Sequence, residues 1–293
     1  MPELPEVETI VRELNREVLG RAFFDVWTDF PKMIKKPKSF EEFRKEIKGK
    51  KILNIRRRGK NILFDLSGNK TLLIHQKLTG HLLLGKWELE KGEWEAKIPG
   101  PLAEDPMNKF LHLIFWLDDG RQLALSDLRK FAKVELWDKE SLEKSEEMKN
   151  LGPEPLEKDF TFEKFKEVLS KKKKGKIKQV LMDQEVIAGL GNIYSDEILW
   201  KAKIHPFKDI SKLSEEELEG IYQAMEEILK KAINAKGESI SDFRRITGEK
   251  GGFDPLRKVY RREGEKCPRC GSIIKRIKIG GRSAHFCPTC QKL

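Results

Sequence analysis

The chain has 293 residues, a length typical of about two domains. Its 59 Lys+Arg outnumber 48 Asp+Glu, giving a formal net charge of +11, and 38% of its residues are hydrophobic. These values exclude a small disulfide-stapled scaffold and wholesale disorder. The longest apolar run, around Leu111–Leu117, is far shorter than the roughly 18–20 residues that cross a bilayer. The sequence opens without a cationic and apolar secretory signal, so we expect a cytosolic protein whose basic charge favours nucleic acid as its partner.

The first half of the chain begins with a helical pattern and continues with β patterns. Residues 6–19 place apolar side chains at the spacing of one helical face, and Pro5 suits the first turn. Eight short β-like runs follow between Phe23 and about Trp137, separated by turn sequences. They predict a β-sandwich or barrel. The charged stretch 138–150 and the Gly-Pro-Glu-Pro run at 152–155 have linker composition, which indicates a domain boundary.

Helical patterns dominate beyond this boundary. Thr161 can cap one helix, and Ser214 with Glu217 forms a capping box before a run that ends at Gly237. All four cysteines lie at the C-terminal end. We therefore predict an α+β chain with flanking helices on an N-terminal β-sandwich domain at 1–138 and a linker at 139–158. A helical domain at 159–262 and a finger at 263–293 complete it.

The cysteines form two C-x₂-C pairs, Cys267 with Cys270 and Cys287 with Cys290. Their spacing is typical of a four-thiolate zinc site, and four protein ligands leave no open position, which predicts one structural zinc ion. The sequence between the pairs predicts a hairpin with almost no apolar core, so zinc must supply much of its folding free energy. Two disulfides or a redox-active pair are the alternatives.

Several motifs together resemble those of one enzyme family. They are the opening PELPEVE at 2–8, RRRGKNILFDL at 56–66, DLRKF at 127–131, IKQVLMDQEVIAGLGNIYSDEILW at 177–200 and the four-cysteine ribbon. The combination resembles the formamidopyrimidine-DNA glycosylase family, bacterial base-excision repair enzymes related to endonuclease VIII, and the matches run nearly end to end. The resemblance implies a helix-two-turn-helix motif in the second domain and a monomeric, nucleoid-associated protein that acts on damaged double-stranded DNA.

The activity that the resemblance implies is that of a bifunctional DNA glycosylase and apurinic/apyrimidinic lyase for oxidised purines, chiefly 8-oxoguanine and formamidopyrimidines. If Met1 is removed, the α-amine of Pro2 can attack a sugar C1′ and form an iminium that permits β,δ-elimination. In the family, the residue matching Glu3 protonates the sugar and the one matching Glu6 supports the site. A chain that retains Met1 should be inactive.

The resemblance also implies a set of DNA contacts. Lys60 follows Gly59 at a predicted hairpin turn, where its ammonium would contact the phosphate near the damaged nucleotide and assist catalysis. Asn192 precedes a predicted helix, so we expect it to be the N-cap of a phosphate-binding helix end, acting together with Arg282. The full set of implied DNA contacts is Lys60, Leu78, His112, Arg129, Phe131, Lys178, Asn192 and Arg282.

Three of these residues should fill the space left by an everted base, namely Leu78, Arg129 and Phe131. Leu78 stands where the family commonly has Met, and Phe131 could instead belong to the core. Lys178 aligns with a lysine implicated near oxidised guanine in relatives, although its lysine-rich neighbourhood fits a solvated helix face equally well. On the finger, Lys275, Arg276 and Lys278 form either a solvated basic face or further phosphate contacts.

Two segments and two alternative functions stay open. The glycine-rich stretch 236–255 has the composition of a mobile loop and matches the family's loop over the everted base, whereas the long loop at 86–107 has no assigned role. An endonuclease VIII-like enzyme for oxidised pyrimidines is the close alternative. A non-enzymatic zinc-ribbon protein that only binds DNA is the alternative from another class.

Overall fold

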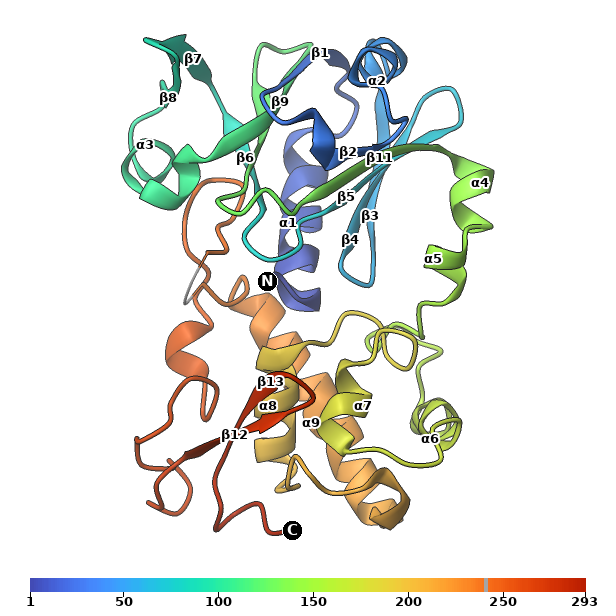
Figure 1. Ribbon diagram of the computed structural model, residues 1–293, viewed down its shortest axis with the longest axis vertical. Helices are drawn as coiled ribbons and strands as arrows, with labels where there is room; N and C mark the ends of the chain where they lie inside the picture. The colour runs from blue at the N-terminus through green and yellow to red at the C-terminus, as the bar shows by residue number, and fades with distance from the viewer. Residues whose placement is uncertain (240–241) are drawn as a thin grey trace. The chain divides into compact units, whose positions relative to one another are not determined.

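The computed structural model describes residues 1–239 and 242–293 (Figure 1). Its contacts divide the chain into two compact units, residues 1–149 with 235–254 and residues 150–234 with 255–293. Within the described part, none of the helices combines the length and the apolar character that a membrane crossing requires.

The first unit is a sandwich of two sheets (Figure 1). One sheet has the order β1 (Phe23–Thr28), β9 (Leu111–Leu117), β10 (Gln122–Ser126) and β6 (His81–Gly85). The other has the order β2 (Ile34–Lys36), β11 (Lys133–Asp138), β5 (Lys70–His75), β4 (Asn61–Leu66) and β3 (Ile52–Arg58). Neighbouring strands are antiparallel, except that β2 runs parallel to β11. The predicted sandwich is confirmed, and all eight predicted strands are present.

Helix α1 (Leu4–Glu17) shares the core of this sandwich. Its face of Val7, Ile10 and Leu14 is fully buried, as the helical spacing of the sequence predicts. The core also joins the two sheets to α2 (Phe40–Ile47), which begins after the N-cap Ser39. Because α1 is embedded in the core, the residues just before it are held against the first unit.

The predicted linker at 139–158 begins with two short helices, α4 (Lys139–Glu143) and α5 (Glu146–Lys149). Leu142 is buried in a small cluster with Leu63 and Leu73 of the second sheet. One leucine among charged residues gives a weak sequence signal, which is why the composition of this stretch indicated a linker.

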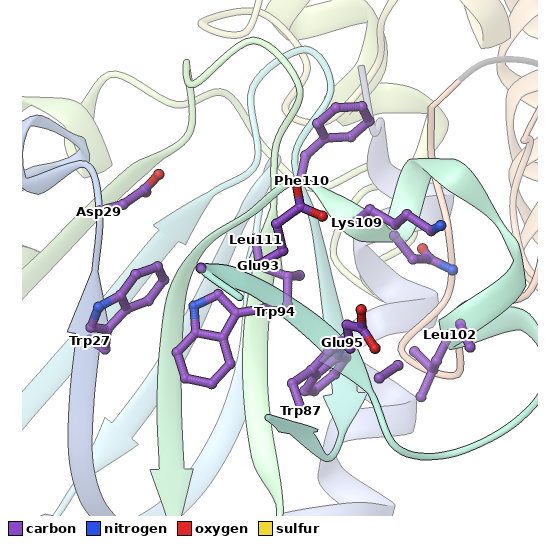
Figure 2. Close-up of a pocket in the computed structure, with 14 residues that line it drawn as sticks. Trp27, Asp29, Trp87, Glu93, Trp94, Glu95, Leu102, Lys109, Phe110 and Leu111 are labelled. Atoms are coloured by element: carbon purple, nitrogen blue, oxygen red, sulfur yellow. The ribbon is translucent and has the colours of Figure 1, made fainter. Parts of the chain in front are cut away.

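The long segment 86–107 folds into a hairpin of β7 (Trp87–Glu90) and β8 (Glu93–Ala96), followed by α3 (Pro101–Glu104). Trp94 packs edge-on against Trp27 at 5.1 Å and Trp116 at 5.9 Å between ring centroids. A cavity of about 640 Å³ lies beside the hairpin, and Figure 2 shows the rings of Trp27 and Trp94 next to each other at its wall. None of the predicted site residues lines this cavity.

The glycine-rich segment 235–254 packs with the first unit. Phe243 and Ile246 belong to the sandwich core, and Leu84 donates its backbone N–H to the Ile246 carbonyl at 2.8 Å. Arg245 also pairs with Glu13 of α1 at 2.6 Å. The described part of this loop is therefore attached by specific contacts, which its glycine content did not predict. Residues 240–241 of the predicted loop lie outside the described residues.

The second unit is helical and ends in a hairpin. It contains α6 (Phe162–Ser170), α7 (Ile177–Met182), α8 (Asn192–Lys201), α9 (Glu215–Asn234), β12 (Lys275–Ile279) and β13 (Arg282–Phe286). Short 3₁₀ turns in the two units lie at Pro31–Met33, Pro106–Lys109, Ile210–Lys212 and Asp254–Leu256. Thr161 caps α6, and Ser214 exchanges hydrogen bonds with Glu217 at the start of α9, as predicted. Helix α8 contacts both α9 and β13.

Acid should destabilise the first unit through His81. Burial lowers the pKa of this fully buried side chain to about 4, and its ring nitrogens contact the Thr79 carbonyl and Asn108 Oδ1. Between about pH 6.5 and 4 the unfolded chain binds a proton that the folded chain excludes, so the free energy of unfolding falls as pH falls. The contribution from this group reaches roughly 3 kcal/mol.

The measurement is denaturant unfolding at pH 7 and pH 4.5, followed by fluorescence. His81→Gln should be less stable than wild type at pH 7 and should lose less stability on acidification. Equal acid sensitivity in the two proteins would contradict the assignment to His81.

Candidate functional site

The first residues of the chain form a buried polar cluster. Pro2 is buried beneath a partly exposed Met1, and the carboxylates of Glu3 and Glu6 are 1% exposed. Glu3 is the N-cap of α1, and its backbone N–H donates to Glu6 Oε2 at 2.7 Å. This bond forms because a carboxylate at the third helical position reaches the free N–H groups at the helix start. Pro2, Glu3 and Glu6 are thus brought together as the motif predicts.

Glu6 also connects this cluster to the segment 235–254. Its Oε1 accepts the backbone N–H of Glu238 at 2.8 Å. The neighbouring Gly237 has φ +81, and an added Cβ there would lie 3.0 Å from Glu6 Cγ and Oε1. Glycine is therefore required at 237 both by backbone conformation and by space. One carboxylate binds the beginning of α1 and the beginning of the loop.

Lys60 lies at the turn between β3 and β4, as predicted, but it is only 7% exposed. The predicted turn position is thus present, and the side chain is buried there. Arg57, which the sequence analysis did not single out, donates to the Gly59 carbonyl at 3.0 Å and pairs with Glu8 of α1 at 3.1 Å. This ion pair joins the hairpin that carries Lys60 to the helix that begins just after Pro2.

A second buried carboxylate organises two neighbouring loops. Asp127, 0% exposed, accepts the hydroxyl of Thr79 and the backbone N–H of Ala132, the latter at 2.7 Å. The hydroxyl of Thr79 in turn accepts the Arg129 N–H at 3.1 Å. These contacts hold the turn between β5 and β6 against the loop between β10 and β11. A buried Asp directly after a strand is the available sequence signal for such a role.

The side chains predicted to fill the vacated base site project from these two loops. Phe131 is 51% exposed, so the alternative that it belongs to the core is wrong. The Arg129 guanidinium lies over its ring at 4.7 Å from the centroid, and Leu78 is half-buried on the adjoining turn. An exposed aromatic ring beneath a guanidinium is a suitable surface for stacking against bases.

His112 lies at the start of β9 and is 9% exposed. Its Nδ1 is 2.9 Å from Asp29 Oδ1, which fixes the orientation of the ring. Lys130 Nζ lies 3.6 Å from the same carboxylate of Asp29. Asp29 therefore connects His112 to the loop that carries Arg129 and Phe131.

In the second unit, Asn192 is the first residue of α8 and Gly191 is the N-cap. The predicted N-cap position of Asn192 is therefore off by one residue, because Gly191 adopts the extended conformation that precedes the helix. The Asn192 Oδ1 atom is buried and has no hydrogen-bond partner among the described residues. Asn192 still lies at the N-terminal end of α8, where the helix dipole favours an anion.

Arg282 is exposed and begins β13, directly after the Gly280-Gly281 turn. The predicted hairpin is confirmed, with Ile279 opposite Arg282 and Lys275 opposite Phe286. Lys275 and Lys278 are also exposed, and the described residues form no ion pair with either. The basic face of the hairpin is open to a polyanion.

The surroundings of Lys178 match neither of the two environments that the sequence suggests. Its side chain is 0% exposed, so a solvated helix face is wrong. Its Nζ lies 2.5 Å from Asp196 Oδ1 and 2.7 Å from the Ser283 carbonyl oxygen. A direct contact of Lys178 with DNA stays a prediction, and its complete burial provides no surface for one.

The four cysteine sulfurs lie within 4.8 Å of one another. The sulfurs of Cys270 and Cys287 are 3.4 Å apart, and those of Cys267 and Cys290 are 4.0 Å apart. Tetrahedral zinc with bonds of about 2.3 Å separates its sulfurs by about 3.8 Å, whereas a disulfide needs about 2.05 Å. The donor set therefore fits zinc, and the disulfide alternative does not describe this geometry.

The electrostatics of the four thiols also favour a cation. Hydrogen bonds from Ser272 lower the pKa of Cys270 to about 6, whereas burial and the neighbouring thiols raise the pKa of Cys290 to about 12. Four thiolates this close repel one another unless a divalent ion lies between them.

Family models match along almost the whole chain. Residues 1–134 match the formamidopyrimidine-DNA glycosylase N-terminal domain, residues 151–244 match its H2TH domain, and residues 264–293 match a zinc finger found in FPG and IleRS. Together with the buried N-terminal cluster and the four-cysteine site, these matches define the chain as a DNA-repair glycosylase with a helix-two-turn-helix domain.

Full-length relatives specify the family. The formamidopyrimidine-DNA glycosylase of Carboxydothermus hydrogenoformans is 41% identical over 292 residues, and that of Pelotomaculum thermopropionicum is 39% identical over 293, with 100% of each chain covered. A Lactococcus lactis FPG variant in complex with a Fapy-dG containing DNA has TM-score 0.86 and 37% identity, with 100% of both chains covered. A MutM complex with carbocyclic 8-oxo-G containing DNA has TM-score 0.85, also at 37% identity and 100% coverage of both. The chain belongs to the formamidopyrimidine-DNA glycosylase family.

Removing one zinc ligand should disrupt the finger alone. Cys270→Ser should lose zinc, unfold the hairpin and abolish DNA binding while the first unit stays folded, because metal binding supplies much of the folding free energy of such a ribbon. Zinc content, circular dichroism and DNA affinity measure this. Thr289→Ala, an exposed change between the last two ligands, is the control. Normal DNA affinity in a zinc-free Cys270→Ser protein would show that the metal is dispensable.

Proposed function

We propose that this chain is a bifunctional DNA glycosylase and apurinic/apyrimidinic lyase that excises 8-oxoguanine and formamidopyrimidines from double-stranded DNA. The observation that carries the proposal is the end-to-end family match combined with a buried Pro2, Glu3 and Glu6 cluster at the start of α1. Neither an endonuclease VIII-like preference nor a purely DNA-binding role accounts for the match to formamidopyrimidine-DNA glycosylases over the full chain.

The chemistry begins at the mature N-terminus. After removal of Met1, the neutral amine of Pro2 attacks the sugar C1′, the N–C1′ bond forms, and the glycosidic bond breaks so that the base leaves with its electron pair. The amine then loses its proton, and the C1′–O4′ bond breaks as O4′ takes a proton from Glu3, which leaves an iminium between Pro2 and C1′. This iminium acidifies the C2′ proton. Loss of that proton expels the 3′ phosphate, and a second elimination expels the 5′ phosphate.

Glu3 supplies the protons for this sequence. Glu3 directly follows Pro2, and its carboxyl group is buried. This group protonates the sugar oxygen as the ring opens and then transfers protons during the elimination steps. Both oxygens of Glu6 accept backbone N–H groups, those of Glu3 and Glu238. We assign to Glu6 the positioning of the nucleophile and of the loop over the base.

DNA is held by cations and helix ends on each unit. Lys60 and His112 on the first unit, and Asn192 and Arg282 on the second, bind backbone phosphates. Leu78, Arg129 and Phe131 fill the space of the everted base, and the exposed ring and guanidinium suit this task. Leu78 is an apolar wedge with less conformational freedom than Met.

We also propose that the enzyme acts as a monomer associated with the bacterial nucleoid. The relatives named above are bacterial proteins, and the +11 charge favours nonspecific binding to DNA.

Borohydride trapping tests the nucleophile. Wild-type protein incubated with an 8-oxoguanine duplex and borohydride should form a covalent adduct, because reduction fixes the iminium. Mass spectrometry should place the attachment at the Pro2 nitrogen. Pro2→Gly should weaken the adduct, and a chain that retains Met1 or carries an acetylated terminus should form none. Attachment at an interior lysine would refute the mechanism.

Glu3→Gln separates proton transfer from binding. Because the amide cannot donate the proton that ring opening needs, the single-turnover rate should fall by about 10²-fold or more. Affinity for a duplex with a nonhydrolysable lesion analogue should change little. Glu41→Gln, an exposed carboxylate on α2, is the control. A rate for Glu3→Gln within a few-fold of wild type would remove Glu3 from the catalytic step.

Affinity should also depend steeply on salt. Several Lys and Arg contacts to phosphate release counterions, so the association constant should fall by orders of magnitude between about 50 and 200 mM salt. Arg282→Ala should reduce the slope of the log–log plot by about one charge. A flat titration would contradict the phosphate contacts.

A further inference from the structure

A completely buried ion pair lies inside the second unit. Lys178 of α7 and Asp196 of α8 are both 0% exposed at the side chain, with 2.5 Å between Nζ and Oδ1. Burying a charged pair costs hydration energy, which is recovered only with good geometry and additional hydrogen bonds. Stability alone therefore does not explain such a pair, and its role is inferred from the elements that it connects.

Three further hydrogen bonds lead from this pair to the zinc hairpin. Lys178 Nζ donates to the carbonyl oxygen of Ser283 at 2.7 Å. Asp196 Oδ2 accepts the backbone N–H of His285 at 2.9 Å and lies 2.9 Å from its ring Nδ1. The pair therefore joins α7, α8 and β13 at one point.

The next residue of α8 holds the chain that leads into the finger. Glu197 is 0% exposed and accepts the backbone N–H groups of Lys258, Val259 and Tyr260 at 2.8–2.9 Å. Burial raises the pKa of Glu197, and the three N–H donors oppose that rise. Two consecutive carboxylates on one helix thus hold the hairpin and the chain that leads into the finger.

Each partner of the ion pair has a link in sequence to one predicted phosphate contact of this unit. Asp196 follows Asn192 by four residues, which is about one helical turn, and Ser283 directly follows Arg282. Helix α7 also contacts the hairpin turn, since a Cβ added to Gly280 would lie 2.2 Å from Gln179 Nε2. The turn that carries Arg282 therefore packs against the Gln179 side chain of α7.

We infer that Lys178 and Asp196 are positioning residues that hold the tip of the zinc hairpin at the start of α8, so that Arg282 and Asn192 engage the same DNA strand together. This inference rests on the proposed function for the DNA grip. It also implies that Lys178 does not recognise the damaged base. A side chain with no exposed surface acts on every duplex alike, whereas a side chain that reads the base acts on one lesion.

The test compares Lys178→Met with Lys174→Met. Lys174 is an exposed member of the same basic run, so the two variants lose the same formal charge. Lys178→Met should weaken Kd by about tenfold, or 1.4 kcal/mol, on undamaged, 8-oxoguanine and formamidopyrimidine duplexes alike. The rate of adduct formation at saturating protein should change far less than Kd. Lys174→Met should show only the small effect of one distant charge.

A double-mutant cycle distinguishes positioning from a general loss of structure. In the wild type, Arg282→Ala and Asn192→Ala each weaken DNA binding. In the Lys178→Met background both losses should shrink, because the hairpin tip no longer presents Arg282 correctly. Asp196→Asn, which keeps the size of the side chain, should give the same pattern. Zinc content and circular dichroism of each variant are measured alongside.

Three results would overturn the inference. One is a loss in Lys178→Met that is confined to 8-oxoguanine duplexes, which would make Lys178 a lesion-reading residue. Another is an unchanged Kd in a folded, zinc-loaded Lys178→Met protein. The third is a loss of DNA affinity from Arg282→Ala that is as large in the Lys178→Met background as in the wild type. Absence of a trapped adduct in the wild type would instead refute the proposed function, so the two failures are distinguishable.

Discussion

The carboxylate of Glu6 is the contact on which the proposed chemistry depends. An N-terminal amine is normally the most mobile group of a chain, and it can serve as a nucleophile only if its position is fixed. Here α1 is embedded in the sandwich core, and Glu6 binds the N–H of Glu3, the residue that follows Pro2. The other oxygen of Glu6 binds Glu238 of the loop. The nucleophile and the segment proposed to cover the base are thereby held by one side chain.

The same arrangement, a buried carboxylate that accepts backbone N–H groups, recurs at Asp127 and Glu197. Asp127 holds the loop of Arg129 and Phe131 against the turn of Leu78. Glu197 holds the approach to the finger. Loops cannot be held by apolar packing alone, because their backbone polar groups need partners. Buried acceptors provide such partners and leave the exposed side chains available for DNA.

The sequence predicts the parts of this molecule that depend on local patterns. Strand alternation, helix caps and cysteine spacing correctly predict the sandwich, α6, α9 and the zinc hairpin, because each depends on residues close together in the chain. Helix α8 begins one residue earlier than the sequence predicts, because Gly191 takes the N-cap conformation in place of Asn192. Lys178 in a run of lysines has the sequence signature of a solvated helix, and its burial depends on Asp196 and Ser283, which are distant in sequence. The Arg57–Glu8 pair was missed for the same reason.

Two kinds of restraint act on the finger, and they act at different places. The four cysteines lie at the base of the hairpin, where zinc ties residues 267–270 to residues 287–290. A hairpin fixed only at its base could pivot, and a small rotation there displaces the tip by several ångströms. The hydrogen bond from Lys178 to the Ser283 carbonyl and the close contact of Gln179 with Gly280 act near the tip. Zinc thus supplies the fold of the finger and the buried pair supplies its orientation on α8. A basic hairpin could bind DNA with the first alone, but only with the second can Arg282 and Asn192 be placed for one backbone.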